Sequence, residues 1–247
     1  MESFQPIAIR PASENRLLFF ARCALDLQLL TVARFLRPRL PRWHGKVLDV
    51  GAGASPWRDL MASADYTGID TVDASAFGMA RRKDIVYYPG GRMPFDDATF
   101  DHVLCTEVLE HVPVPVEFLA ELGRVLRPGG TLLLTVPWSA RVHHVPHDFH
   151  RFTRYGLEGV LRAARFKVLE IEERGNDLAA IANKLLVWCV RLLRPRPSVK
   201  LVYTGVGAIL LAPLLLTFMV IAHMALYFGW GSKEDPLGYG ASAVKPS

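Results

Sequence analysis

Cysteine is scarce in this chain: Cys23, Cys105 and Cys189 are the three present among 247 residues, and they lie far apart. They are too few and too scattered for a disulfide framework or a cysteine-based zinc site. The sequence also lacks internal repeats and low-complexity segments. Its length allows one packed α/β domain with additional segments.

Charged residues are missing from Leu201–Trp230, which contains no Asp, Glu, Lys or Arg and only His223 as an ionisable group. A membrane-spanning helix needs about 20 apolar residues. We therefore expect residues 201–230 to insert in a membrane. Pro213 near the middle either kinks a single span or bends a re-entrant segment that returns to the same side.

Basic residues precede this apolar run, at Arg191, Arg194, Arg196 and Lys200, and the whole chain has a net charge of +5. The positive-inside tendency predicts a membrane-associated protein in which the domain before the apolar run lies in the cytoplasm. The charge favours anionic lipid or an anionic small molecule as partner. Nucleic acid is not expected, because no basic motif is interleaved with aromatic residues. The sequence does not indicate the oligomeric state.

A glycine turn follows the first predicted strand, 46–50. Gly51 and Gly53 let the backbone turn sharply and approach a ligand closely. Asp70 ends the next predicted strand, where a carboxylate usually holds a ribose. The third glycine of a dinucleotide fingerprint is replaced by Pro56, which disfavours a diphosphate. The pattern therefore predicts a cofactor with adenosine but without phosphates.

Three later segments sharpen this prediction: Met93–Cys105, Thr106–Val112 and Phe118–Gly130. Together with the glycine turn they resemble class I S-adenosylmethionine (SAM)-dependent methyltransferases of the small-molecule branch with LPF, SFD and LEH signatures. The resemblance covers about residues 45–173. It implies SAM as the cofactor. The expected fold is α/β, a Rossmann-like, doubly wound and mainly parallel sheet with an N-terminal cap helix and the C-terminal membrane segment.

The resemblance also implies a cofactor site. In such families the turn wraps the methionine end of SAM and the carboxylate after the second strand takes the ribose hydroxyls. The acid that often lies near the adenine amine is missing from Tyr88–Arg92. Glu107 and His111 follow the fourth strand and either line the pocket floor or start a helix. The residues expected to bind the cofactor are Asp49, Gly51, Gly53, Asp70 and Glu107.

The loop after the fifth strand contains four of the eight histidines. Its segment His147–Thr153 resembles an element of methyltransferases that accompany cell-envelope glycan synthesis. His147 or His150 is the expected general base, with Asp148 orienting an imidazole. Arg151 is suited to an anionic acceptor, and His111 and Tyr155 are also expected to bind substrate. The alternative is that Asp148 and Arg151 pair to order the loop, while Thr153 caps the following helix.

A metal is not expected. The four histidines of the loop have no cysteine partner, and their spacing matches no standard zinc motif. They are His143, His144, His147 and His150.

The expected organisation is an N-terminal amphipathic cap segment (1–44), a SAM-binding domain (45–175), an amphipathic helix with a basic linker (176–200), a transmembrane or re-entrant segment (201–230) and a tail (231–247). The predicted elements alternate between strands and helices. The strands are expected at 46–50, 66–70, 84–88, 101–105, 131–136 and 167–173, and the helices near 56–63 and at 115–126, 154–164 and 177–194. No final antiparallel strand is expected after residue 173.

These observations predict a membrane-tethered, SAM-dependent methyltransferase acting on a glycan, a lipid-linked sugar or another small-molecule acceptor. One alternative is methylation of a lipophilic, quinone-like acceptor, which rests on membrane location. The other is a degenerate, non-catalytic methyltransferase fold that serves as a membrane scaffold.

Overall fold

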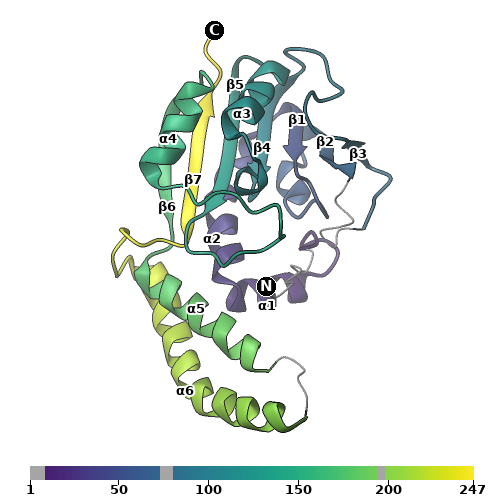
Figure 1. Ribbon diagram of the computed structural model, residues 1–247. Helices are drawn as coiled ribbons and strands as arrows, with labels where there is room; N and C mark the ends of the chain where they lie inside the picture. Colours follow the sequence, from purple (N-terminus) through teal and green to yellow (C-terminus); the bar gives the residue numbers. More distant parts are fainter. Residues whose placement is uncertain (1–8, 73–79, 194–197) are drawn as a thin grey trace.

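A twisted seven-stranded sheet forms the centre of the protein in the computed structural model, which describes residues 9–72, 80–193 and 198–247 (Figure 1). The strand order is β3-β2-β1-β4-β5-β7-β6. The strands are β1 (Gly45–Val50), β2 (Ala64–Thr71), β3 (Ile85–Tyr88), β4 (Phe100–Thr106), β5 (Leu126–Pro137), β6 (Lys167–Arg174) and β7 (Gly238–Val244).

The sheet is mainly parallel. β1 pairs in parallel with β2 and β4, β2 with β3, and β4 with β5, whereas β7 is antiparallel to both β5 and β6. The carboxyl ends of the six parallel strands therefore meet at one edge. Ligands of open α/β sheets bind at this edge.

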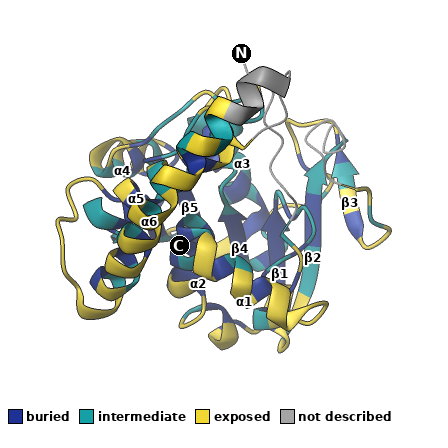
Figure 2. Ribbon diagram, turned by 90° about the horizontal axis from the view of Figure 1, so that it is seen from below, coloured by how far each residue is buried: buried dark blue, intermediate teal, exposed yellow. Residues whose placement is uncertain are grey.

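Helices cover both faces of the sheet (Figure 2). On one face, α3 (Pro115–Val125) and α4 (Arg154–Ala163) pack their leucines against the strands. On the other, α1 (Arg16–Leu25) and α2 (Leu27–Leu36) pack against buried side chains of β1, β4 and β5. Short 3-10 turns complete this part: η1 (Leu40–Arg42), η2 (Arg58–Met61) and η4 (Leu109–His111). The predicted helix near 56–63 is thus the single turn η2.

The N-terminal segment is two helices, where the sequence predicted one cap helix. Asp26 separates them: its backbone ends α1, and its side chain accepts the Leu29 amide at 3.1 Å and so caps α2. The buried residues of α2 lie on a sheet face with Val47, Leu104 and Leu133. The segment 1–44 therefore contributes a layer of the core within its described residues.

The prediction that no final antiparallel strand follows residue 173 was wrong. β7 lies between β5 and β6, paired from Thr131 with Val244 to Pro137 with Gly238 on one side. The segment expected to be a tail therefore supplies an interior strand. Four of its seven residues are Gly or Ala, which are depleted in strands, so burial between two strands stabilises it instead.

A helical hairpin is inserted between β6 and β7. It consists of α5 (Asp177–Leu192) and α6 (Ser198–Phe228), the second containing Pro213. Figure 1 shows the hairpin extending beyond the sheet. Among the described residues, Tyr203–Phe228 is the one helical stretch long and apolar enough to cross a membrane. Only 17% of the residues in its most apolar 18-residue part are buried.

Candidate functional site

The glycine turn after β1 has the geometry that the sequence predicted. Gly51 and Gly53 have positive φ angles of 70° and 50°. The Gly51 amide donates to the Ile69 carbonyl at 2.9 Å, which ties the turn to β2. A Cβ on Gly51 would collide with the Val108 side chain after β4. Glycine is therefore required for the close approach between these two strand ends.

Asp70 closes the same turn from the end of β2. One carboxylate oxygen accepts the Gly53 amide at 2.9 Å, and the other accepts the Thr71 amide at 2.7 Å. Burial raises the pKa of this carboxyl. The turn and Asp70 thus form one unit. The Asp70 carboxylate is an oriented hydrogen-bond acceptor, and it lies beside Gly51 and Gly53, which have no side chains. This unit fits a ribose and the methionine end of SAM.

Asp49 lies beneath the turn. Its side chain is 1% exposed and accepts a hydrogen bond from the Tyr66 hydroxyl at 2.8 Å. Burial raises the pKa of Asp49 to about 7. Asp49 is thus bonded to Tyr66 beneath the turn and supports the turn from below.

Glu107 follows β4 in the left-handed region, with a φ of 53°. Its carboxylate accepts from the Arg174 guanidinium at 2.7 Å. Arg174 is 3% exposed and also donates to the Val136 and Tyr239 carbonyls, at 2.9 and 3.1 Å. Arg174 was not predicted from the sequence to belong to the site. The feature that could have indicated it is a basic residue at the carboxyl end of a predicted strand. It positions Glu107 at the edge next to the cofactor turn.

The loop after β5 is organised by Asp148 and Arg151. The two side chains form a bidentate ion pair, with N–O distances of 2.6 and 2.8 Å. Arg151 also donates to the Arg141 and His150 carbonyls, at 2.9 and 2.7 Å. The structure therefore supports the alternative in which this pair orders the loop. An acceptor anion at Arg151 would compete with these internal partners.

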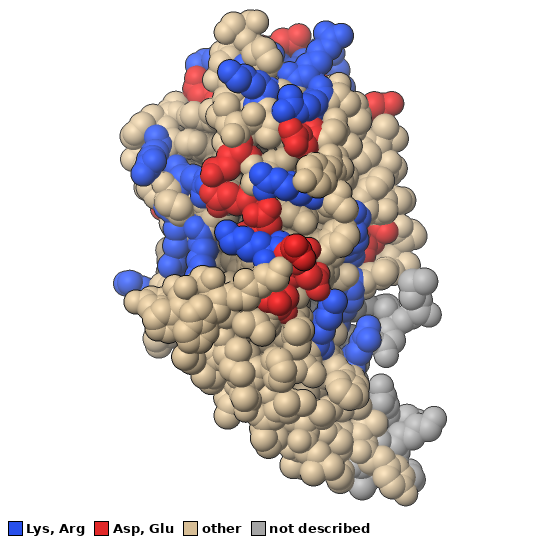
Figure 3. Space-filling view, turned by 90° about the vertical axis from the view of Figure 1, so that its left-hand side faces the viewer, with Lys and Arg blue, Asp and Glu red and all other residues tan. Residues whose placement is uncertain are grey.

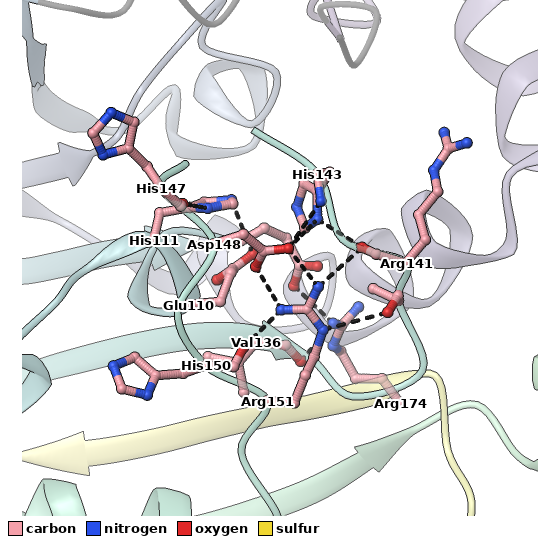
Figure 4. Close-up of polar contacts among 12 residues, drawn as sticks. Glu110, His111, Val136, Arg141, His143, His147, Asp148, His150, Arg151 and Arg174 are labelled. Carbon is pink, nitrogen blue, oxygen red and sulfur yellow. Dashed lines mark hydrogen bonds and ion pairs between the residues drawn. The ribbon is translucent and has the colours of Figure 1, made fainter. Parts of the chain in front are cut away.

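The expected pairing of Asp148 with His147 or His150 is corrected by the structure (Figure 4). Asp148 accepts the backbone amide of His143 at 2.9 Å and lies 3.3 Å from its imidazole. His150 stacks obliquely on Phe152, with ring centroids 5.3 Å apart. His147 is exposed. The reason is the Asp148–Arg151 pair, which directs the carboxylate toward the start of the loop.

Tyr155 lies apart from this group, on α4 with 80% of its surface exposed. The predicted cap Thr153 is confirmed, because its hydroxyl accepts the Gly156 amide at 3.0 Å. A substrate role for Tyr155 would thus require a ligand that extends over α4.

His111 joins the loop histidines instead. The imidazoles of His111, His143 and His144 form a cluster, with their ring centroids between 4.7 and 5.2 Å apart. Burial and the neighbouring His143 lower the pKa of His111 to about 4, and burial lowers that of His144 to about 4. These two rings are therefore neutral near pH 7. Glu110, next to His111, is fully buried, and burial followed by the nearby Glu107 raises its pKa.

Two cavities lie near the base of the hairpin. One of about 300 Å³ lies between α2, the end of β6 and the end of α6. The other, of about 270 Å³, lies between the loop after β5 and α5. Arg141, Lys184 and Arg191 line the second cavity together with Val187 and Trp188. Cationic and apolar side chains thus meet beside the loop that follows β5.

Comparisons with known proteins identify the family of the chain. A methyltransferase domain family matches residues 48–134. A phthiotriol/phenolphthiotriol dimycocerosates methyltransferase of Mycobacterium ulcerans is 40% identical over 99 residues, which are 36% of this chain and 36% of that protein. A ubiquinone biosynthesis O-methyltransferase of Thiobacillus denitrificans is 31% identical over 165 residues, which are 57% of this chain and 71% of that protein. The chain therefore matches about a third of the length of the Mycobacterium relative.

The fold has counterparts among solved structures. The 1,6-didemethyltoxoflavin-N1-methyltransferase of Burkholderia thailandensis, crystallised with S-adenosylhomocysteine, aligns with a TM-score of 0.50 and 17% identity, covering 95% of this chain and 84% of that one. At this identity the likeness shows the fold alone.

The chain belongs to the SAM-dependent methyltransferases. The matched domain is that of a SAM-dependent methyltransferase, and its cofactor is SAM. SAM supplies an electrophilic methyl group on a sulfonium. The protein must then align an acceptor atom with the methyl–sulfur bond, which is a problem of positioning.

Proposed function

We propose that this enzyme is seated in a membrane and methylates a lipid-held small molecule with an anionic head group. The position of the hairpin carries the proposal. The chain enters α5 directly after β6, at the carboxyl edge of the sheet. Gly51, Asp70 and the loop after β5 lie at the same edge. A membrane around the hairpin would therefore face the site where the methyl group is transferred.

The surface of the hairpin supports membrane insertion. Figure 3 shows a lower part almost without charged side chains and an upper part densely covered with them. Large apolar side chains are exposed along α6, several above 60%: Tyr203, Ile209, Leu210, Leu216 and Tyr227. An apolar patch of this kind marks a membrane or protein contact. The absence of acidic and basic residues from 201–230 favours lipid.

The return of the chain to β7 favours a hairpin that stays in one leaflet. Both of its ends join the same sheet, so the chain crosses either twice or not at all. Two crossings would carry the basic residues between the helices to the far side, which the positive-inside tendency disfavours. We therefore propose a re-entrant segment, with the catalytic domain on the cytoplasmic face.

The cavity beside the loop supports the anionic head group. Lys184 and Arg191 come from α5 and Arg141 from the loop, while Val187 and Trp188 add apolar surface. Phosphate groups bind such cations, and the apolar side chains suit the first carbons of a lipid chain. This combination fits a lipid-linked sugar, the acceptor that the His147–Thr153 element also suggested.

A lipophilic quinone-like acceptor is the second candidate. The Thiobacillus relative is named for ubiquinone biosynthesis. This chain matches a larger share of that relative than of the Mycobacterium relative, 71% against 36%. A quinone-like molecule would also reach the site from the membrane. It would not need the cationic cavity, so the two acceptors make different demands on Lys184.

His147 or His150 as general base is also a proposal, relevant to a hydroxyl acceptor. Both lie in the loop at the catalytic edge. Loss of turnover in His147→Ala or His150→Ala, with SAM binding retained, would support it. Unchanged turnover in both variants with the true acceptor would remove it.

Flotation with vesicles tests membrane seating. Full-length protein is mixed with vesicles containing anionic lipid, and the bound fraction is compared with that of Leu210→Glu and Leu216→Glu combined. We expect the variant to lose binding by at least about 10-fold, because two charges enter the lipid-facing surface. Leu169→Glu is the control, since Leu169 is 55% exposed but lies on β6. Equal binding of all three proteins would contradict membrane seating.

A second assay tests the acceptor. Methyl-labelled SAM is incubated with the enzyme and a bacterial lipid extract, and the label is followed into the organic phase. Lys184→Ala should reduce labelling of an anionic lipid-linked acceptor and leave labelling of a quinone-like acceptor unchanged. Label that enters only water-soluble products would contradict a lipid-held acceptor of either kind.

A further inference from the structure

Three imidazoles from two separate segments converge near the catalytic edge. His111 ends the turn η4, whereas His143 and His144 lie within the loop that follows β5. Each contributes one ring nitrogen, and these nitrogens lie within 4.8 Å of one another. His144 is held there in the left-handed region, with a φ of 53°. A backbone outlier at such a place commonly marks a functional constraint.

Hydrogen bonds orient two of the rings. Nδ1 of His111 donates to the His147 carbonyl, and Nδ1 of His143 donates to the Arg141 carbonyl at 3.0 Å. A carbonyl only accepts, so each Nδ1 carries the proton and each Nε2 keeps a lone pair. This arrangement is the usual support of metal-binding histidines, in which the second nitrogen is fixed by a backbone carbonyl.

A carboxyl group lies against the cluster without a hydrogen-bond partner. Glu110 is 0% exposed, and neither of its carboxyl oxygens accepts a hydrogen bond from the described part of the chain. Its Oε1 is 3.6 Å from Nε2 of His111. An unpartnered buried carboxyl is costly. A cation between Glu110 and the imidazoles would satisfy it.

We propose that His111, His143, His144 and Glu110 bind a divalent transition-metal ion such as Zn²⁺. Imidazole nitrogens and a carboxylate oxygen are ligands that zinc prefers, and four of them complete a tetrahedral site. An ion equidistant from three nitrogens 4.8 Å apart would be about 2.8 Å from each, against about 2.0–2.1 Å for a zinc–nitrogen bond. Rotations that move each nitrogen by less than about 1 Å close the site.

The ion would join η4 to the loop after β5. Glu110 already holds this loop through its carbonyl, which accepts the amides of Phe149 and His150 at 2.9 and 3.1 Å. A metal would add side-chain bonds across the same junction and so order the acceptor side of the active site. The sequence spacing hid this site because His111 lies far from the other two histidines along the chain.

Metal binding to the full-length protein in detergent tests the proposal without any acceptor. After chelator treatment, Zn²⁺ is titrated by calorimetry, and Co²⁺ is added in a parallel experiment to record its visible absorption. We expect one ion per chain and the intense bands of tetrahedral Co²⁺.

Two variants remove ligands, and two serve as controls. His144→Ala and Glu110→Gln should each weaken binding by at least about 10-fold. His147→Ala and His150→Ala, in the same loop but outside the cluster, should bind as the unmodified protein does. Circular dichroism shows that each variant is folded, and Glu110→Gln keeps the size of the side chain. Absence of binding, or equal losses in the control variants, would overturn the proposal, whatever the acceptor proves to be.

Discussion

Arg174 connects three strands with the candidate site at the scale of single residues. It leaves the end of β6, donates to carbonyls of β5 and β7, and holds Glu107 after β4. The guanidinium is almost fully buried, so these partners satisfy its donors in place of water. Arg174 is therefore a positioning residue, which joins Glu107 to the strands β5, β6 and β7.

Replacing Arg174 by methionine should destabilise the protein strongly. The variant removes the donor to the Glu107 carboxylate and a side-chain donor to two strand carbonyls, and the loss of hydrogen bonds to a charged group costs about 1.5–3 kcal/mol. Thermal unfolding in detergent measures the loss. The matched control is Arg162→Met, which breaks the exposed pair with Glu158 on α4 and should cost less than about 1 kcal/mol. Similar losses in both variants would contradict this role of Arg174.

Asp49 should make stability depend on pH. In the unfolded chain this carboxyl titrates near 3.8, whereas burial raises its folded pKa to about 7. Between these values the folded state holds an extra proton, so the contribution of Asp49 to stability falls as the pH rises from about 4 to 7. Asp49→Asn removes the titration and keeps an acceptor for Tyr66.

The advantage of Asp49→Asn over the unmodified protein should therefore grow from near zero at pH 4 to roughly 2–4 kcal/mol at pH 8 without cofactor. Unfolding midpoints at both pH values measure it. Asp65→Asn, at the exposed start of the same strand, is the control and should show no such growth. A constant difference for Asp49→Asn would show that the buried carboxyl does not titrate in this range.

The strand β7 is the element on which the fold of the C-terminal part depends. Gly238 begins it, where a Cβ would collide with the Arg174 guanidinium and the Val136 carbonyl. The chain must reach this position after the long helix α6. The hairpin is consequently an insertion between two strands of one sheet, tied to the domain at both ends.

Gly238→Ala should destabilise the sheet by about 1–3 kcal/mol through overpacking. The neighbouring carbonyl belongs to the backbone and cannot move aside easily. Denaturant unfolding gives the value. Gly159→Ala is the control on α4, where the structure leaves open space for the methyl group. That control should be neutral or stabilising by up to about 1 kcal/mol. A neutral Gly238→Ala would contradict the tight fit of β7.

The sequence predicted most elements before β7 to within a few residues. β1, β4 and β6 follow from runs of β-branched and apolar residues, and α4 from its cap Thr153. β7 was missed because its residues are small and its stability comes from two neighbouring strands. The break at Asp26 was missed because the apolar residues continue on both sides of it.

The site was predicted in part, for a similar reason. Gly51, Gly53 and Asp70 are set by local turn chemistry, so their spacing along the chain was informative. The partner of Asp148 and the position of His111 depend on contacts between distant segments. Arg174 likewise acts across strands that are not neighbours in the sequence. Spacing motifs do not record such contacts.

At the scale of the whole molecule, a methyltransferase sheet is joined to an apolar hairpin at its catalytic edge (Figure 1). The glycine turn lies at the ends of β1 and β2, and the loop after β5, the proposed acceptor side, lies at the same edge. The hairpin begins at the end of β6, beside both. Cofactor from the aqueous phase and acceptor from the membrane would thus meet at one edge, provided that this edge binds SAM at the glycine turn.

Calorimetric titration of SAM into the full-length protein in detergent tests that claim most directly. The account predicts saturable binding of one SAM per chain, abolished by Asp70→Ala because the variant loses both the ribose acceptor and the hydrogen bond that orients Gly53. Asp65→Ala, at the other end of β2, should bind SAM as the unmodified protein does. Binding that survives Asp70→Ala, or no binding to the unmodified protein, would contradict a SAM site at this turn.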